Sequence, residues 1–240
     1  MRAFVICRDR VTYARQCVDA LRTVGERLWD GLDIVIVDHG STWPPMVEWL
    51  DTVGRSDGVQ VSRWDNRHPR DLWAPAGIIS HMLTSVDERF LVTDCDVIPD
   101  PDCPTDWPQI MNAYLDHLPA VRKVGLGLRT DDIPAHHAHR DMVQAWEAQY
   151  QAPVAAPVIY NPGAAGVFAD IDTTLAMYRR CEPFALGPAV RLQAPYVARH
   201  LPWYEDTLSL DAEQAYYREH AVHGHWRDPG GYADDYKLRG

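Results

Sequence analysis

Two aspartates separated by one residue, Asp94 and Asp96, stand at the end of the apolar run of residues 90–93. Residues two apart in a strand face the same side, and a turn at the strand end would bring both carboxylates to one point of a cleft. Two ionised carboxylates that close repel each other unless a cation lies between them. Mg²⁺, or Mn²⁺ with its similar oxygen ligands, would bind both and also hold a diphosphate. The pattern is short, and a solvated turn with two surface acids is the alternative interpretation.

The segments that would position these aspartates alternate between two patterns in the first half of the chain. Short apolar runs typical of strands occur at residues 4–7, 34–37, 59–61 and 90–94. Apolar residues at helical spacing lie between them, at residues 11–28, 44–53 and 78–86. This alternation predicts an α/β fold with a parallel, doubly wound sheet, which binds ligands beyond the carboxyl ends of its strands.

Charged residues stand at three of those strand ends. Arg8-Asp9-Arg10 follows the first apolar run, Asp38 ends the second, and the aspartate pair ends the fourth. The sequence therefore predicts a site at this edge of the sheet. The prolines at 44 and 45 suit the first turn of a helix that a preceding serine or threonine caps.

The second half of the chain is less regular. Helices are expected at 107–118, 138–150 and 211–221, and strands at 124–128 and 171–178, the latter with two different faces. The Pro- and Ala-rich stretch 151–166 predicts a loop with a short apolar segment at 158–160. The tail 223–240 is rich in glycine and aspartate and is expected to be disordered or to close over a ligand.

Composition narrows the class of protein. The chain has 240 residues, 46% of them hydrophobic, which suffices for the core of one domain. The net charge of −11 disfavours nucleic acid or an anionic membrane as a partner, although a local basic groove is not excluded. We expect no transmembrane segment, a first strand rather than a signal peptide at the N-terminus, and five reduced cysteines in a cytoplasmic setting.

Three segments together resemble the family 2-like branch of the GT-A nucleotide-sugar glycosyltransferases. They are residues 4–21, residues 34–42, and residues 90–99 with the aspartate pair. The resemblance is good over residues 3–100. It implies one GT-A-like domain over 1–240 with a Rossmann-type, mostly parallel sheet flanked by helices. The nucleotide-binding half would be 1–100, a mixed acceptor-side half 101–222, and the tail a possible lid.

The resemblance also implies roles in donor binding. Asp38 matches the acid that hydrogen-bonds the base, usually uracil, with a turn or cap as the alternative. Arg8, Asp9 and Arg10 match the first loop, which contacts the nucleotide. In the loop that covers the nucleotide, Asn66 stands at the matching position and Arg70 would bind a phosphate. Aromatic residues would shape the sugar pocket: Trp73, Trp203 and Tyr204.

The implied cofactor is Mn²⁺ or Mg²⁺. Asp94 would contact the ribose or, through water, the metal, and Asp96 would ligate the metal directly. His200, which precedes a Pro-Trp pair, matches a late histidine that completes the metal shell. Cys95 is expected to point into the fold rather than to act as a ligand.

The chain departs from the family 2 pattern because it lacks the usual Glu-Asp pair that supplies the catalytic base. Asp172 is the preferred substitute, because it would point off the apolar face of its expected strand. Asp132, or its neighbour Asp131, would follow a strand end and precede a Pro-bounded loop. Glu147 is a further option, although a solvated helix face is its expected place.

Two histidine clusters, 136–139 and 223–225, lack the spacing of a helical zinc site, and a loop near the acceptor is the favoured interpretation.

The leading hypothesis is a metal-dependent transfer of a sugar from a nucleotide-diphosphate donor, UDP-linked by preference, to an unidentified hydroxyl. A sugar-phosphate nucleotidyltransferase is the first alternative, which the absence of glycine in residues 8–14 disfavours. A non-catalytic module that binds nucleotide sugars is the second, motivated by the missing Glu-Asp pair.

Overall fold

The computed structural model describes residues 1–28, 31–64, 69–74, 76–83, 85, 88–152, 154–179 and 184–220, without the side chains of residues 69 and 70. Asn66, the Arg70 side chain, the 223–225 histidine cluster and the tail 223–240 therefore lie outside the described part of the chain. Within that part, no helix is both long and apolar enough to cross a membrane.

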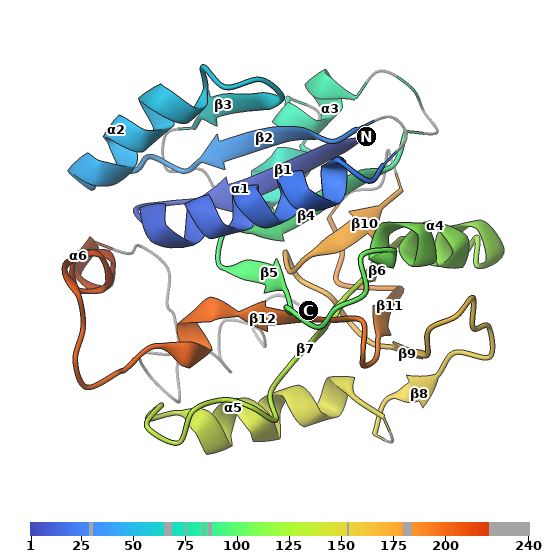
Figure 1. Cartoon of the computed structure of the whole chain (residues 1–240). Helices are drawn as coiled ribbons and strands as arrows, with labels where there is room; N and C mark the ends of the chain where they lie inside the picture. The colour runs from blue at the N-terminus through green and yellow to red at the C-terminus, as the bar shows by residue number, and fades with distance from the viewer. Residues whose placement is uncertain are drawn as a thin grey trace.

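The first half forms a parallel sheet in the order β3-β2-β1-β4 (Figure 1). Its strands are β1 (Arg2–Cys7), β2 (Asp33–Asp38), β3 (Val59–Arg63) and β4 (Phe90–Asp94). The segments that connect them contain α1 (Val11–Gly25), α2 (Pro44–Val53), the 3₁₀ helix η1 (Pro69–Trp73) and α3 (Ile78–Met82). The predicted α/β class is confirmed, with α1 and α3 shorter than expected.

The N-terminus of α2 is held by a residue far away in the sequence. Neither Ser41 nor Thr42 caps this helix, and Trp43 occupies the cap position without a side-chain bond. The buried carboxylate of Asp9 instead accepts hydrogen bonds from the backbone N–H groups of Thr42 (2.6 Å) and Trp43 (2.7 Å). The predicted local cap was wrong because the β1–α1 loop supplies the acceptor for these unpaired N–H groups.

The second half extends the sheet with strands of both directions, which gives the order β3-β2-β1-β4-β10-β6-β11-β9-β8. A smaller sheet has the order β5-β12-β7. The added strands are β5 (Val97–Pro99), β6 (Lys123–Gly125), β7 (Gly127–Leu128), β8 (Ala156–Pro157), β9 (Gly166–Phe168), β10 (Ala176–Tyr178), β11 (Ala189–Leu192) and β12 (Val197–His200). The helices are α4 (Trp107–His117), α5 (Arg140–Glu147), η2 (Ala148–Tyr150), η3 (Leu201–Tyr204) and α6 (Ala212–His220).

Two strand predictions in this half were wrong in extent. The expected strand 171–178 forms only as β10, which is buried on both faces because it is inserted antiparallel between β4 and β6. The expected strand 124–128 divides into β6 and β7, which belong to different sheets. At Gly127 a Cβ atom would lie 2.5 Å from the carbonyl oxygen of Leu192, so this crossing requires glycine.

The core occupies both faces of the large sheet. Alternate residues of β1 divide between the faces, Val5 toward α1, α2 and α4, and Phe4 toward η1 and α3. Helix α5 lies along the side of β12 away from the parallel strands (Figure 1). The two core layers cover the faces of the sheet, and the loops that form the candidate site lie at the carboxyl ends of the parallel strands.

Candidate active site

The carboxyl ends of three parallel strands lie at one edge of the sheet. Asp94 of β4 is in register with Ile6 of β1, and Asp38 of β2 is in register with Cys7. The backbone N–H of Cys95 donates to the carbonyl of Ile6 (2.8 Å), which holds the chain between the two aspartates against the end of β1. The Cys95 side chain is buried, as expected.

The small sheet brings His200 next to Asp96. Strand β12 runs antiparallel to β5 with His200 opposite Val97, and the N–H of Leu201 donates to the carbonyl of Asp96 (2.8 Å). As a result His200 Nε2 lies 3.6 Å from Asp96 Oδ2. The guanidinium of Arg10, from the β1–α1 loop, forms an ion pair with the same carboxylate oxygen. Three sequence-predicted residues, Arg10, Asp96 and His200, therefore meet at one point.

The other aspartate of the pair, Asp94, has a different environment. Thr173 Oγ1 donates to Asp94 Oδ2 (2.6 Å), and the Asp94 N–H donates to the Thr173 carbonyl (3.0 Å). Burial raises the pKa of Asp94 well above its usual value, and the charge of Asp96 raises it further. Burial also lowers the pKa of His200, so its imidazole is neutral at neutral pH.

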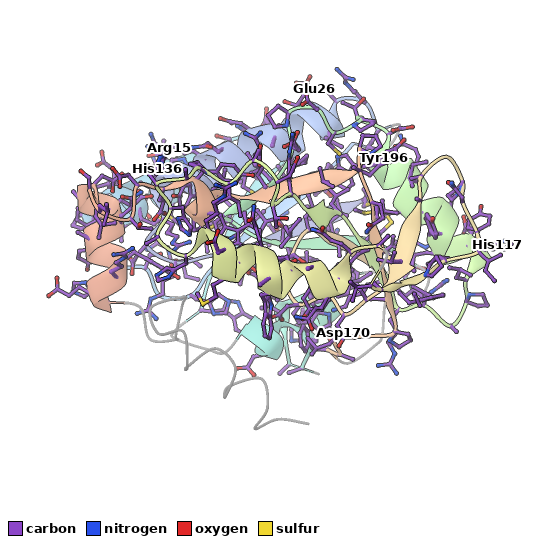
Figure 2. The ribbon with its side chains drawn as sticks, turned by 90° about the horizontal axis from the view of Figure 1, so that it is seen from below. Arg15, Glu26, His117, His136, Asp170 and Tyr196 are labelled. Atoms are coloured by element: carbon purple, nitrogen blue, oxygen red, sulfur yellow. The ribbon has the colours of Figure 1, made fainter. Side chains whose placement is uncertain are left out.

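A cavity of about 390 Å³ opens on the Asp96 side of this pair. Its walls come from the β1–α1 loop, η3, α6 and the segment that precedes α5 (the His136 side of Figure 2). Residues that line it include Arg10, Tyr13, Asp96, His137, His139, His200, Trp203, Glu205, Glu213, Tyr217 and Arg218. The cavity thus combines charged side chains of both signs, the Arg10–Asp96 ion pair among them, with several aromatic rings, which suits a ligand with charged and flat portions.

A smaller cavity of about 140 Å³ opens on the Asp94 side. Asp94 and Asp172 both line it, together with Trp146, Tyr150 and Arg191. His200 and Trp203 line both cavities, so they form a shared wall. The two aspartates of the pair therefore face different spaces that meet at His200 and Trp203.

Helix α6 lies across the edge of the sheet, on the side toward which the parallel strands point (Figure 1). Glu213 accepts hydrogen bonds from the backbone N–H (3.1 Å) and the hydroxyl (3.2 Å) of Thr12. The guanidinium carbon of Arg10 lies 3.7 Å from the ring centroid of Tyr217. The helix thereby covers the residues between β1 and α1.

Asp38 and Asp9, which the sequence predicts to contact the nucleotide, bond to neighbouring residues of their loops. Asp38 Oδ1 accepts from the N–H (3.1 Å) and the hydroxyl of Ser41 (2.5 Å), as in the turn that was the alternative interpretation. Asp9 forms an ion pair with Arg8 (3.5 Å) besides its bonds to the start of α2. The linings of the two cavities, drawn from the described residues, include neither aspartate. Their roles toward a nucleotide remain predictions.

Trp73 packs away from the cavities. Its ring lies 5.5 Å from that of Tyr178 and 5.1 Å from that of Phe184, between ring centroids. It contacts the core layer on the η1 and α3 face of the sheet. Its predicted part in a sugar pocket stays a prediction.

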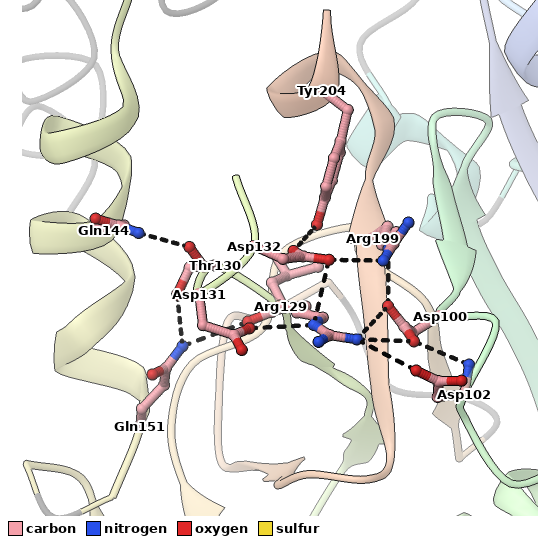
Figure 3. A network of polar contacts seen from close by, with 11 residues as sticks. Asp100, Asp102, Arg129, Thr130, Asp131, Asp132, Gln144, Gln151, Arg199 and Tyr204 are labelled. Carbon is pink, nitrogen blue, oxygen red and sulfur yellow. Dashed lines mark hydrogen bonds and ion pairs between the residues drawn. The ribbon is translucent and has the colours of Figure 1, made fainter. Parts of the chain in front are cut away.

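Asp132 belongs to an ion-pair network on the opposite face of β12 (Figure 3). One of its oxygens accepts from Arg199 (2.6 Å) and the other from Tyr204 (2.6 Å). Because Arg199 and His200 are consecutive in a strand, their side chains point to opposite faces. Asp131 pairs with Arg129 in the same network (3.1 Å). The structure therefore separates Asp132 and Tyr204 from Asp96, whereas Asp172 lies beside Asp94.

The expectation that Glu147 lies on a solvated helix face was wrong. Its side chain is 7% exposed and pairs with Arg191 of β11 (3.1 Å), because α5 turns this face toward the sheet. Burial raises the pKa of Glu147, and the Arg191 charge opposes that shift. Glu147 lines the smaller cavity as one half of an ion pair.

Sequence reasoning missed several residues that line the cavities or contact the pair. His137 and His139 line the larger cavity, although their cluster had been assigned only to a loop near the acceptor. Thr173 and Arg191 were not predicted, because their partners Asp94 and Glu147 lie 79 and 44 positions away. The local signal in this segment was the histidine cluster 136–139 near an expected helix start, and its predicted place near an acceptor stays a prediction.

Comparison with known proteins identifies the fold. No protein-family model matches the chain, and no curated protein does. The structure of S. aureus TarS 1-349 superposes with a TM-score of 0.50 and 12% identity, covering 90% of this chain and 67% of that one. TarS 1-349 in complex with UDP-GlcNAc gives 0.49 and 10% identity, covering 82% and 57%. The mannosyltransferase PcManGT from Pyrobaculum calidifontis, in complex with GDP-Man and Mn²⁺, gives 0.44 and 18% identity, covering 75% and 44%.

The likeness to TarS 1-349 extends over nearly the whole of this chain and carries the assignment, since the other two superpose less completely. The chain has the α/β fold of the GT-A-like glycosyltransferases, as the sequence resemblance implied.

Proposed function

We propose that the protein is a glycosyltransferase that moves a sugar from a nucleotide-diphosphate donor to a hydroxyl of an acceptor. The observation that carries this proposal is the pair of cavities that meet at Asp94, Asp96, His200 and Trp203 on a GT-A-like fold. A transferase that uses two substrates needs two adjoining spaces with a shared wall where the reacting atoms meet.

The larger cavity is the proposed donor site. Arg10 and Arg218 are the two arginines among the residues that line it, and we assign Arg10, which lies at Asp96, to the diphosphate, because a guanidinium fork binds oxyanions and keeps its charge at every physiological pH. The aromatic rings of Tyr13, Tyr217 and Trp203 offer flat surfaces for a base or a sugar. UDP is the nucleotide to test first, because the family resemblance matches Asp38 to the uracil-binding acid.

A divalent cation, Mn²⁺ or Mg²⁺, is the cofactor that this fold implies. The donor set fits it chemically: Asp94 and Asp96 offer carboxylate oxygens, and His200 is neutral, with an Nδ1 atom that no described residue hydrogen-bonds. Among the described residues, however, no three such side chains are grouped closely enough to form a metal site. When bound, the cation would offset the charge that develops on the departing diphosphate.

The position of Arg10 explains why suitable metal ligands are present although the described residues do not group into a metal site. Its guanidinium is ion-paired with Asp96, at a side chain that is 11% exposed, and this pairing occupies the carboxylate that a cation would use. A cation on Asp96 would release Arg10, which would then contact the diphosphate. We therefore expect Arg10 and the metal to compete for Asp96 before the donor binds, and both to contact the donor diphosphate afterwards.

Asp172 is the proposed general base. It lines the smaller cavity beside Asp94, while Asp132 is engaged with Arg199 and Tyr204 on the other face of β12. The segment that carries Asp172 is fixed by its backbone, since Lys123 and Tyr178 donate to the Asp172 carbonyl (3.3 Å and 2.9 Å). These bonds hold the backbone of the segment, and the side-chain carboxylate that it presents to the cavity can accept the proton of an acceptor hydroxyl.

The proposal is tested by a thermal-shift screen of UDP-, GDP- and dTDP-sugars with and without MnCl₂, followed by an assay of nucleotide release. A metal-dependent rise in Tm with one donor and slow release of its nucleoside diphosphate are expected. Release of pyrophosphate from a nucleoside triphosphate and a sugar phosphate would indicate the nucleotidyltransferase instead. Binding without any turnover would indicate the non-catalytic module.

A further inference from the structure

Two buried side chains in the wall of the larger cavity each have one polar atom without a hydrogen-bond partner. His137 and Trp203 line this cavity and are 7% and 3% exposed. Neither His137 Nδ1 nor Trp203 Nε1 finds a partner within the described part of the chain. Buried polar atoms are almost always paired, so two such atoms in the wall of one cavity indicate a ligand that pairs with them.

The His137 ring is fixed in one tautomer by the backbone of Glu205. The Glu205 carbonyl accepts a hydrogen bond from this ring, which requires a protonated ring nitrogen. Since Nδ1 is the atom without a partner, the proton lies on Nε2 and Nδ1 keeps its lone pair. Burial lowers the pKa of His137 although the bond to Glu205 opposes that shift, and Arg218 and two histidines nearby lower it further. The ring is therefore neutral at neutral pH, and Nδ1 is a hydrogen-bond acceptor.

The backbone around His137 is held in place by bonds in two directions. The His137 N–H donates to the carbonyl of Pro134 (3.0 Å), and the His137 carbonyl accepts from the N–H of Arg140 (3.1 Å). The N–H of Ala138 donates to Thr207 Oγ1 (3.1 Å), which connects this segment to the chain that follows η3. The ring is thus positioned before a ligand binds, and a fixed acceptor selects among similar ligands better than a flexible one does.

Trp203 supplies the opposite kind of group. An indole Nε1–H only donates, whereas Nδ1 of this His137 tautomer only accepts. The indole ring packs against the ring of His200, with ring centroids 4.7 Å apart, in the wall that the two cavities share. A hydroxyl both donates and accepts, so neighbouring hydroxyls of one sugar can pair with both atoms. An ionised phosphate or carboxylate can pair only with Trp203, and an ammonium only with His137.

We propose that His137 and Trp203 are specificity-determining residues that bind hydroxyls of the transferred sugar. This inference rests on the proposed glycosyltransferase function and names the part of the donor that these residues select. Trp203 lies in the shared wall of the cavities, where the sugar has to lie for its anomeric carbon to reach an acceptor. A donor sugar without the matching hydroxyl leaves the buried Nδ1 atom of His137 unpaired, which lowers its affinity.

The first experiment compares donors that differ by one oxygen atom. Calorimetry on the full chain with MnCl₂ would measure the binding of UDP-glucose and UDP-galactose, and of the analogues of each that lack one sugar hydroxyl. We expect at least one deoxy analogue to bind about tenfold more weakly than its parent sugar nucleotide. Binding of every analogue within about twofold of its parent would overturn the inference.

His137→Gln separates the hydroxyl contact from a general loss of structure. The glutamine amide N–H can replace Nε2–H toward the Glu205 carbonyl, but the side chain has no acceptor at the position of Nδ1. We expect about tenfold weaker binding of the parent and unchanged binding of the weak deoxy analogue, so the difference between the two disappears. An equal loss for both ligands would show a structural role and contradict the inference.

His136→Gln is the matched control, because His136 is exposed and does not line the cavity (Figure 2). This variant should bind the parent and the deoxy analogue as the wild type does. Trp203→Phe keeps a flat ring but removes the Nε1–H, and it should also bind the parent about tenfold more weakly. Parent binding within about twofold of the wild type would overturn the role assigned to Trp203.

Nitrogen-15 NMR of the histidine rings tests the same contact without a substitution. We expect the free protein to carry the His137 proton on Nε2, and the Nδ1 resonance to shift upfield when the parent donor binds but not when the weak deoxy analogue binds. A proton on Nδ1 in the free protein would overturn the inference, since that atom could then no longer accept a hydrogen bond.

The inference and the proposed function fail in different ways. If UDP-glucose or UDP-galactose binds and is hydrolysed while no deoxy analogue is disfavoured, the inference fails and the transferase proposal stands. If no nucleotide sugar binds or is hydrolysed, the proposed function fails, and the inference fails with it.

Discussion

Each face of β12 carries a cluster of arginine and aspartate side chains, and the two clusters differ in how completely these side chains are paired. On one face Arg129 and Arg199 form ion pairs with Asp100, Asp131 and Asp132, as Figure 3 shows. On the other face Arg10, His200 and the aspartate pair lie between two cavities.

The two clusters differ in how many of their polar atoms have a partner within the protein. Both oxygens of Asp132 accept a bond from a protein donor, and Asp100 is fully buried between two arginines. Such a network holds the small sheet in shape. On the His200 face, by contrast, Asp96 lines the larger cavity and Asp94 the smaller one, and His200 Nδ1 and Trp203 Nε1 have no partner among the described residues. Completeness of pairing, rather than the number of charges, distinguishes a structural cluster from a candidate site.

The largest predicted effect follows from Asp96→Asn. The change removes the carboxylate charge from the proposed donor site, and we expect turnover to fall about 10³-fold, the size of losing a main electrostatic contact. Steady-state nucleotide release measures this loss, and calorimetry with UDP and MnCl₂ shows whether binding is lost with it. Turnover within threefold of the wild type would mean that Asp96 stabilises the fold and takes no part in the reaction.

The matching change on the other face is Asp100→Asn. It leaves two arginines without their shared carboxylate, and we expect the free energy of unfolding to fall by about 3 kcal/mol. Urea denaturation measures this loss. The turnover of the folded fraction should stay within threefold of the wild type, whereas a selective loss of kcat would place this face in the reaction.

Asp172→Asn and Asp132→Asn compare the two candidate bases directly. We expect the first to lower kcat about 10²-fold with unchanged donor affinity, because it removes the proton acceptor from the smaller cavity. The second should lower Tm and leave kcat nearly unchanged. The reverse pattern would show that the base lies on the opposite face of β12.

The pH dependence of stability is a further test of the Arg129–Arg199 cluster. Burial alone would raise the pKa of Asp100, but the N–H of Asp102 and the two arginines outweigh it and lower this pKa. A lowered carboxyl pKa adds stability above the unfolded value of about 4 and loses it as pH falls through the folded value. The stability difference between wild type and Asp100→Asn, measured by urea unfolding, should therefore shrink between pH 5 and pH 2. A constant difference would contradict the charge assignment.

The smallest predicted effect concerns α6. Tyr217→Leu removes the ring that lies on the Arg10 guanidinium, a contact worth about 1 kcal/mol. We expect a change of about fivefold in the donor KM and little change in kcat. An unchanged KM, with only a lower Tm, would mean that α6 stabilises the fold without contacting the donor site.

The parallel half of the fold was predictable because its signals are local. Runs such as residues 34–37 identify buried strands, and three of the four strand ends carry their predicted charged residues in the same short segment. The same logic brought Asp94, Asp96 and Asp38 to one edge of the sheet. His200 was placed by resemblance, and the register of β12 against β5 explains its position.

The remaining features depend on contacts that no local pattern encodes. The cap of α2 comes from Asp9 of another loop, and the partner of Asp94 is Thr173. The alternation at 171–178 resembled a two-faced strand, but the segment is inserted between two strands and only its end pairs. Glu147 read as a surface residue because its partner Arg191 lies on a strand that the sequence did not predict.

A crystal structure of the chain soaked with UDP and MnCl₂ would test the proposed donor and metal site most directly. We expect a diphosphate in the larger cavity, a cation on Asp96 near His200, and Arg10 moved from Asp96 to the phosphates. A nucleotide bound elsewhere, or an intact Arg10–Asp96 pair beside an empty cavity at saturating ligand, would contradict it.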